Sequence, residues 1–259
     1  MLLNAISRKD DKDLTSFETS EDFTRLIGEN ISGMKIAIPN YFVSDIVDKS
    51  VLEVFEKTVD RLKNLGCTVD FVDVPFIDKA VVLYQIIAMG EASSNLARFD
   101  GVRYGLSIPD KTIDEMYKKT RTEGFGVEVK RRIMVGSYIL SGENAKIYYN
   151  KAMAIRDDLQ KSFNKIFEDY DLIIGPTSSR VAYDLNTATD NPLRSFMDDV
   201  LVMHANMGGF PAMNIPMGFI EKMPIGLQIM GKMYDEALIY KLGAALEKEL
   251  NLDLGGLHE

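Results

Sequence analysis

The most constraining feature of this chain is an early alternation between strand-like and helix-like segments. The run MKIAIP, from Met34 to Pro39, is short, apolar and rich in β-formers, which predicts a buried strand. The run CTVDFVDVP, from Cys67 to Pro75, alternates apolar and polar residues as a half-buried strand does. Between them, apolar residues recur every three or four positions, as on one face of a helix. This order indicates a βαβ unit, although spacing alone leaves the direction of strand pairing open.

Two local signals mark the ends of the helix in this unit. Ser50 and Glu53 match the S-x-x-E capping box, in which each side chain bonds to a backbone N–H of the first turn. Gly66 supplies a stop, because glycine adopts the left-handed conformation that ends many helices. We therefore expect the helix to begin at Ser50 and to end just before Gly66.

The remaining segments predict an α/β fold in which helices surround a mixed β-sheet. Further strands are expected at 171–177, 213–220 and 225–232, and the short turn between the last two indicates a hairpin. Asp235 can cap a final helix. Helices are expected at 78–98, 126–140 and 144–168. The third of these carries an apolar stripe formed by Tyr148, Ala152, Ile155, Leu159, Phe163 and Ile166.

Composition excludes several classes of protein. The net charge is −9, and no cluster of Lys and Arg interleaved with aromatic residues offsets it, so a free-standing nucleic-acid binder is not expected. No window approaches the roughly 18 apolar residues that a membrane helix needs, and no contact with a membrane is expected. The start of the chain does not match a secretory signal. With one cysteine, Cys67, the chain cannot form an internal disulfide, which fits the cytoplasm.

No motif of nucleophilic, nucleotide-binding or metal chemistry is present in the sequence. It contains no G-x-S-x-G elbow, no Walker A loop and no complete G-x-G-x-x-G. A catalytic triad would have to use His204, because His258 is next to the last residue. His204 stands among apolar residues, so we interpret it as a buried structural histidine. Cys67 has no histidine nearby in sequence and is interpreted as a core thiol.

Four polar stretches could contribute to a site, and each also has an ordinary structural explanation. The run from Glu91 to Asn95 fits a polar helix face. Lys130, Arg131 and Arg132 fit a solvated face, unless one arginine points inward. Asp198 and Asp199 could cap the apolar segment that follows them. The run from Gly175 to Ser179 follows a predicted strand, where binding sites collect, but a serine-rich loop is also common.

Taken in order, these stretches resemble the amidase-signature family, and within it the glutaminase subunits of tRNA-dependent amidotransferases. The resemblance covers essentially the whole chain. It rests on EASSNLARFDGVRYG (91–105), GFGVEVKRRIMVGSYIL (124–140), YDLIIGPT (170–177), GGFPAMNIPMGF (208–219) and PIGLQIMGK (224–232). It implies hydrolysis of glutamine to ammonia by two serines and a lysine. The ammonia would pass to a second subunit (B), which uses ATP and Mg and handles the tRNA, while a third (C) braces the complex.

The resemblance also implies where the parts of the site lie. The Gly/Ser-rich segment that carries the serines and lysine in this family has no match in these 259 residues, so no catalytic residue is assigned and the amidase domain is expected to be incomplete, without its N-terminal half. The resemblance places the grip on the glutamine carboxylate at Arg132, the grip on its ammonium at Asp199, and a pocket wall at Tyr84. A shift of one position would substitute Arg131 or Asp198.

Residues 1–33 resemble the family's linker, and 34–259 would form the C-terminal portion of one amidase-like domain. The resemblance thus implies that the chain holds no cofactor of its own. Its partners would be glutamine and the B and C subunits, and it would contact tRNA only through the B subunit. Isolated, it should be inactive. Two alternatives remain open: a non-catalytic remnant that serves as an assembly module, and part of an amidase for another small amide.

Overall fold

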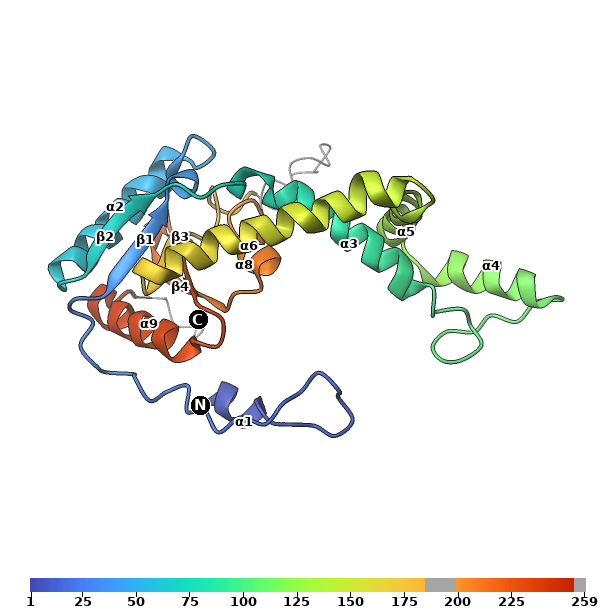
Figure 1. Cartoon of the computed structure of the whole chain (residues 1–259), viewed down its shortest axis with the longest axis horizontal. Helices are drawn as coiled ribbons and strands as arrows, with labels where there is room; N and C mark the ends of the chain where they lie inside the picture. The colour runs from blue at the N-terminus through green and yellow to red at the C-terminus, as the bar shows by residue number, and fades with distance from the viewer. Residues whose placement is uncertain (185–198, 254–259) are drawn as a thin grey trace. The chain divides into compact units, whose positions relative to one another are not determined.

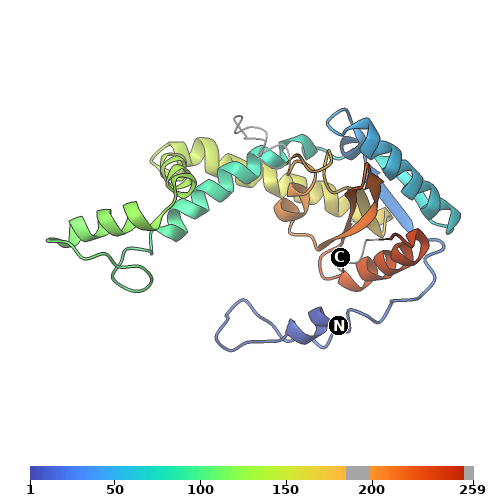
Figure 2. The same ribbon diagram turned by 180° about the vertical axis from the view of Figure 1, so that it is seen from behind.

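A computed structural model describes residues 1–184 and 199–253 of the chain. The chain divides into two compact units: unit 1 comprises Met1–Asp78 and Leu159–Glu259, and unit 2 comprises Lys79–Asp158. Unit 1 contains the β-sheet, and unit 2 is built from helices (Figures 1 and 2).

The sheet of unit 1 is mixed, as predicted. Its strands are β1 (Lys35–Pro39), β2 (Thr68–Val72), β3 (Leu172–Pro176), β4 (Ala212–Ile220) and β5 (Met223–Gly231). They lie in the order β2-β1-β3-β5-β4. Strand β1 pairs in parallel with β2 and with β3, which settles the direction that the sequence left open and confirms the βαβ unit. Strands β4 and β5 form the predicted antiparallel hairpin, and β5 also pairs antiparallel with β3.

Helices α2 (Lys49–Asn64) and α9 (Glu236–Leu250) pack on this sheet, and both contact β4. Helix α2 ends as predicted, since Gly66 has φ +88°. Its start was predicted wrongly. The N-cap is Asp48, without a side-chain bond, and Ser50 already lies inside the first turn, so the pair Ser50–Glu53 cannot form the expected capping box.

The predicted stripe on the helix from 144 to 168 is only partly buried. A π-helical turn, η3 (Ala145–Asn150), precedes α6 (Lys151–Asp169). Because a π-turn holds more residues than an α-turn, Tyr148 no longer lies on the same face as the apolar residues of α6. Leu159 and Phe163 are fully buried, and Ala152 is nearly so, whereas Tyr148 is 38% exposed. Phe167, which the stripe omitted, is buried in place of Ile166.

Short elements complete unit 1. Helix α8 (Met203–Gly208) ends at Gly209, whose φ of +71° turns the chain toward β4. The 3-10 helices are η1 (Asn40–Val43) and η2 (Ile77–Lys79), the latter running into unit 2. Helix α1 (Leu2–Ile6) begins a long N-terminal segment, in which Phe17 makes an edge-to-face contact with Tyr234, two residues before α9.

Unit 2 is organised by two helices that pack unusually closely, α3 (Ala80–Leu96) and α5 (Val127–Leu140). A Cβ added at Gly136 of α5 would lie 1.9 Å from the carbonyl oxygen of Met89 on α3, so only glycine permits this approach. Between them in sequence, α4 (Ile113–Gly124) begins at a true capping box formed by Thr112 and Glu115, which the sequence analysis missed.

Candidate functional site

The arginines expected to grip a carboxylate lie on α5 of unit 2 and differ in how they meet Glu128. Arg131 binds it through two bonds, Nε to Oε2 and Nη2 to Oε1, both 2.8 Å. Arg132 donates only Nε–H to Oε1, at 2.9 Å. Among the described residues, no acceptor bonds to the two terminal nitrogens of Arg132. The fork of Arg131 is therefore occupied, whereas Arg132 keeps donors for another anion.

The charge of Glu128 is fixed by these two neighbours. Hydrogen bonds from Arg131 and then from Arg132 lower its pKa to about 2. Glu128 consequently stays ionised across the physiological range and orients both guanidinium groups. This side chain was not singled out from the sequence. Its position three and four residues before Arg131 and Arg132 on a helix is the signal that could have identified it.

The other two predicted site residues lie on different elements. Tyr84 stands on α3 in unit 2 and is half-buried, while its helix neighbours Leu83 and Ile87 are buried. Asp199 belongs to unit 1 and its side chain is exposed. Asp199 starts the turn before α8, as expected of a cap, but it does so with its backbone. Its carbonyl oxygen accepts from the N–H groups of Val202 and Met203 at 3.1 and 3.2 Å. The alternative Asp198 lies outside the described residues.

Two members of the polar run on α3 bond to other helical segments, while Asn95 accepts a local bond from Arg98 at 3.2 Å. The hydroxyls of Ser93 and Ser137 of α5 lie 2.9 Å apart, and the hydroxyl of Tyr149 donates to Glu91 at 3.4 Å. Next to them is a shallow hollow of about 300 Å³, lined by Gly90, Glu91, Ser94, Asn95, Leu140 and Tyr149. This cross-helix role, with the close approach at Gly136, makes the run a structural element of unit 2.

His204 is a buried structural histidine, as predicted. It is 1% exposed, and the rings of Tyr41, Phe42 and Phe163 meet it edge-on. Its Nε2 lies 2.9 Å from the carbonyl oxygen of Ile77, so the neutral ring carries its proton there. Burial lowers its pKa, more than the two nearby carbonyl groups raise it. No catalytic carboxylate or hydroxyl is among these described partners. The second histidine, His258, lies outside the described residues.

The loop after β3 forms a second hollow of about 300 Å³, bounded by residues 178–183 and 224–226. Thr177 donates its hydroxyl to Asn214 of β4, and the carbonyl of the buried Ser179 accepts from the N–H of Asp48 at 2.8 Å. These bonds attach the loop to the sheet. Gln228, also buried, donates to the carbonyl of Leu201 at 3.0 Å. Neither Asn214 nor Gln228 was marked by sequence, because both lie in strand-like runs.

Cys67 is buried, as expected of a core thiol. Its Sγ lies 3.4 Å from the carbonyl oxygen of Ile31, and burial raises its pKa. Within residues 1–184 and 199–253, no group of three or more His, Cys, Asp or Glu side chains is placed to hold a metal ion. No helix in that part of the chain is long and apolar enough to span a bilayer.

Comparison with known proteins identifies the family. The family model "Amidase" matches residues 1–240. The chain belongs to the amidase family. It is 47% identical over 248 residues to the A subunit of the Glutamyl-tRNA(Gln) amidotransferase of Pediococcus pentosaceus, and 44% identical to that of Streptococcus mutans serotype c. Each alignment covers 95% of this chain and 51% of the relative, so this chain spans about half the length of the curated relatives it matches.

Solved structures of the family share the fold described above. The A subunit of the Glutamyl-tRNA(Gln) amidotransferase of Thermotoga maritima is 32% identical, with a TM-score of 0.73 over 93% of this chain and 48% of its own. A bacterial aryl acylamidase and 6-aminohexanoate cyclic dimer hydrolase, at 18% and 19% identity, have TM-scores of 0.70 and 0.72. The mixed α/β arrangement is thus the amidase fold over about half of those chains.

Proposed function

We propose that this chain is the glutamine-binding half of the glutaminase subunit of a Glu-tRNA(Gln)/Asp-tRNA(Asn) amidotransferase. The observation that carries the proposal is the 47% identity to the A subunit of such an enzyme over 95% of the chain. Two solved structures named for hydrolysis of other amides are only 18% and 19% identical. In this proposal residues 1–33 act as a linker, and 34–259 belong to one amidase-like domain.

The chemistry of glutamine explains the assigned residues. Free glutamine carries a carboxylate and an ammonium group, so its pocket needs one cation and one anion. Arg132 suits the carboxylate, because its terminal nitrogens keep donors while Glu128 orients the guanidinium through Nε. The exposed carboxylate of Asp199 suits the ammonium, and Tyr84 would supply a wall. The assignment of these three residues to glutamine rests on the resemblance to the family.

The rest of the reaction would be carried by other segments and subunits. Two serines and a lysine from the half of the glutaminase subunit that this chain does not match would hydrolyse the amide, with the serine activated by the adjacent base. The B subunit would use ATP and Mg to attach the ammonia to mischarged tRNA, and the C subunit would brace the assembly. This chain itself would hold no cofactor.

The test is glutaminase activity of the complete assembly. The 259-residue chain is produced together with the complementary half of a glutaminase subunit and with the B and C subunits, and ammonia release from glutamine is measured. Arg132→Ala should raise the KM for glutamine about 10- to 100-fold, because a charged bond to the carboxylate is lost. Arg131→Ala is the matched control. It should change the KM for glutamine less than about threefold, because a solvent-exposed ion pair such as Arg131–Glu128 contributes little energy.

Equal effects of the two substitutions would remove Arg132 from the pocket. The chain by itself should release no ammonia, and measurable activity would contradict the assignment of the nucleophile to the complementary half. A stable complex with the B and C subunits that never gains activity would favour the alternative, an assembly module without catalysis.

A further inference from the structure

A hollow in unit 1 is lined by none of the residues assigned to the glutamine pocket. It measures about 350 Å³ and is enclosed by the N-terminal segment and the start of α9. Its walls include Arg8, Phe17, Glu21, Phe23, Tyr234 and Glu236. This volume is within the range of small-molecule sites.

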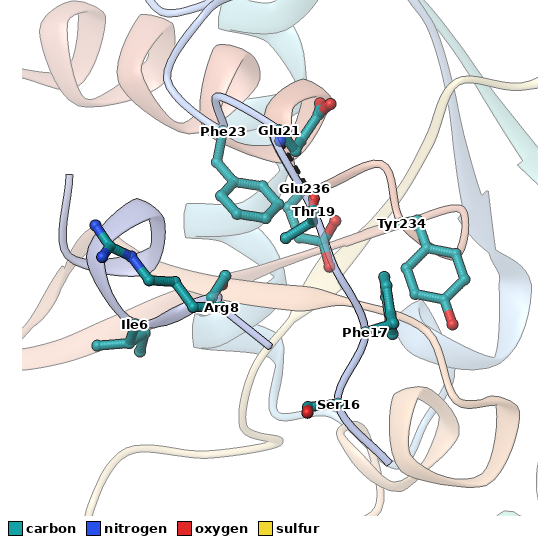
Figure 3. Close-up of a pocket in the computed structure, with 10 residues that line it drawn as sticks. Ile6, Arg8, Ser16, Phe17, Thr19, Glu21, Phe23, Tyr234 and Glu236 are labelled. Atoms are coloured by element: carbon teal, nitrogen blue, oxygen red, sulfur yellow. Dashed lines mark hydrogen bonds between the residues drawn. The ribbon is translucent and has the colours of Figure 1, made fainter. Parts of the chain in front are cut away.

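One end of the hollow is aromatic. The rings of Phe17 and Tyr234 meet edge-to-face with centroids 5.6 Å apart, yet the two residues are 57% and 67% exposed. Figure 3 shows this pair on one side and Phe23, which is buried, toward the other. Exposed rings that flank a hollow offer apolar area that a bound group would cover.

The backbone of Tyr234 is held in an unfavourable conformation. Its φ is +66°, in the left-handed region that bulky side chains rarely adopt. Strain of this kind persists only where the surrounding structure enforces it, and it is concentrated at binding and catalytic positions. Here the strained residue is the one that supplies the aromatic wall from the α9 side.

Two opposite charges line the same hollow without neutralising each other. Arg8 and Glu236 form no ion pair with each other, and neither has a hydrogen-bond or ion-pair partner through its side chain among the described residues. Glu21 differs, because Arg25 pairs with it. Figure 3 shows Arg8 at the end opposite the Phe17–Tyr234 pair, with Glu236 between them. A ligand that satisfies both charges must carry an anion and a cation together.

We propose that this hollow binds a free amino acid with an apolar side chain. Its carboxylate would meet Arg8, its ammonium would meet Glu236, and its side chain would lie against Phe17, Phe23 and Tyr234. Arginine grips a carboxylate through two bonds, and a carboxylate accepts from an ammonium. A peptide would present only one of the two charges at a terminus, so the free amino acid is favoured.

The experiment is equilibrium dialysis of the full 259-residue chain against isotope-labelled L-phenylalanine. We expect a dissociation constant of about 1 mM or tighter for a ligand of this size. Competition by 3-phenylpropionate, which lacks the ammonium, and by phenethylamine, which lacks the carboxylate, should each be at least about tenfold weaker than by unlabelled L-phenylalanine. Glycine, which lacks the ring, should compete poorly.

Substitutions locate the site. Arg8→Gln and Glu236→Gln should each weaken binding about tenfold or more, as should Tyr234→Ala. Lys9→Gln and Glu247→Gln are the matched controls, on the same segments but outside the hollow, and should leave binding unchanged. Circular dichroism of every variant checks that it folds. Arg132→Ala should also bind normally, which separates this site from the proposed glutamine pocket.

Three results would overturn the proposal: no binding of L-phenylalanine up to about 10 mM, equal competition by a probe that lacks one charge, or unchanged binding by Glu236→Gln. None of these results bears on the glutamine pocket, whose test is the KM of the assembled enzyme.

Discussion

Unit 1 and unit 2 differ in how completely they bury their own apolar residues. In unit 1, side chains from the sheet and its helices are fully enclosed, including Phe55, Leu227 and Leu242, all at 1% exposure or less. In unit 2, all of whose residues are described, α5 presents Val127, Met134 and Tyr138 with 83%, 73% and 58% exposed. A mixed sheet with helices supplies its own core, whereas a few helices leave apolar faces that need further partners.

The charge of the two units differs as well. Acidic residues outnumber basic ones in the whole chain, 39 against 30, but Lys and Arg outnumber Asp and Glu within 79–158. Unit 2 also carries the predicted arginine grip and Tyr84, while Asp199 lies in unit 1. The enclosed sheet core of unit 1 and the exposed apolar face of α5 in unit 2 belong to separate parts of one chain, and substitutions can test this division.

The largest effect is expected from the core of unit 1. Leu227 is fully buried in β5 between Pro176 of β3 and Ile215 of β4. Leu227→Ala should lower the free energy of unfolding by about 2–5 kcal/mol, because it removes transfer energy and leaves a cavity. Urea unfolding followed by circular dichroism measures this change.

The contrasting variant lies on the exposed face of unit 2. Met134→Ala should change the free energy of unfolding by no more than about 0.5 kcal/mol, as for most surface positions. The same face should limit solubility of the chain, so Met134→Lys should raise it. Equal destabilisation by Leu227→Ala and Met134→Ala would contradict the contrast between the buried core of unit 1 and the exposed face of α5 in unit 2.

An intermediate effect is expected where unit 2 depends on a single close approach. Gly136→Ala would drive a Cβ into the carbonyl of Met89 and force α3 and α5 apart, at a cost of about 1–3 kcal/mol. Hydrogen exchange read by mass spectrometry should show faster exchange in both helices, with the strands of unit 1 unaffected.

Gly126→Ala is the control for this prediction. Gly126 is the N-cap of α5, and a Cβ there meets nothing within 4 Å. Its substitution should loosen only the first turn of α5. Equal loss of protection on α3 in both variants would show that the contact at Gly136 does not hold the pair together.

A graded effect on stability comes from pH. Burial lowers the pKa of His204 in the folded state. Between the native and the unfolded pKa, the histidine is therefore protonated in the unfolded chain and neutral in the native chain. Stability should therefore be complete above the unfolded pKa of about 6.5 and decline as pH falls below it, by up to about 1.4 kcal/mol per pH unit until the lower native pKa is reached.

Urea unfolding at a series of pH values between about 7 and 5 measures that slope around the histidine pKa. His204→Gln lowers stability overall but should flatten the slope over the same interval. A slope that remained the same in the variant would assign the pH dependence to other groups.

The sequence alone located the strands of the sheet, because their signals are local, whereas the direction and order of strand pairing came from the structure. Apolar runs and three- or four-residue periodicity located β1, β2, β3 and the β4–β5 hairpin, and Gly66 marked the end of α2. The same local rules failed at Ser50, where Asp48 is the N-cap instead, and at the stripe after Tyr148, where a π-helical turn shifted the face. Both depend on where a helix begins, which propensity specifies least well.

Tertiary structure alone decided how the side chains divide their bonds. Helical spacing could not distinguish Arg131 from Arg132, since both follow Glu128 by three or four residues. Only the geometry shows the guanidinium of Arg131 fully engaged and that of Arg132 partly open. The hollow beside Phe17 and Tyr234 joins residues more than 200 positions apart, far beyond any periodic pattern. Local sequence specifies backbone hydrogen bonds between residues a few positions apart. A pocket joins residues that are distant in sequence, and only the packing of the folded chain brings them together.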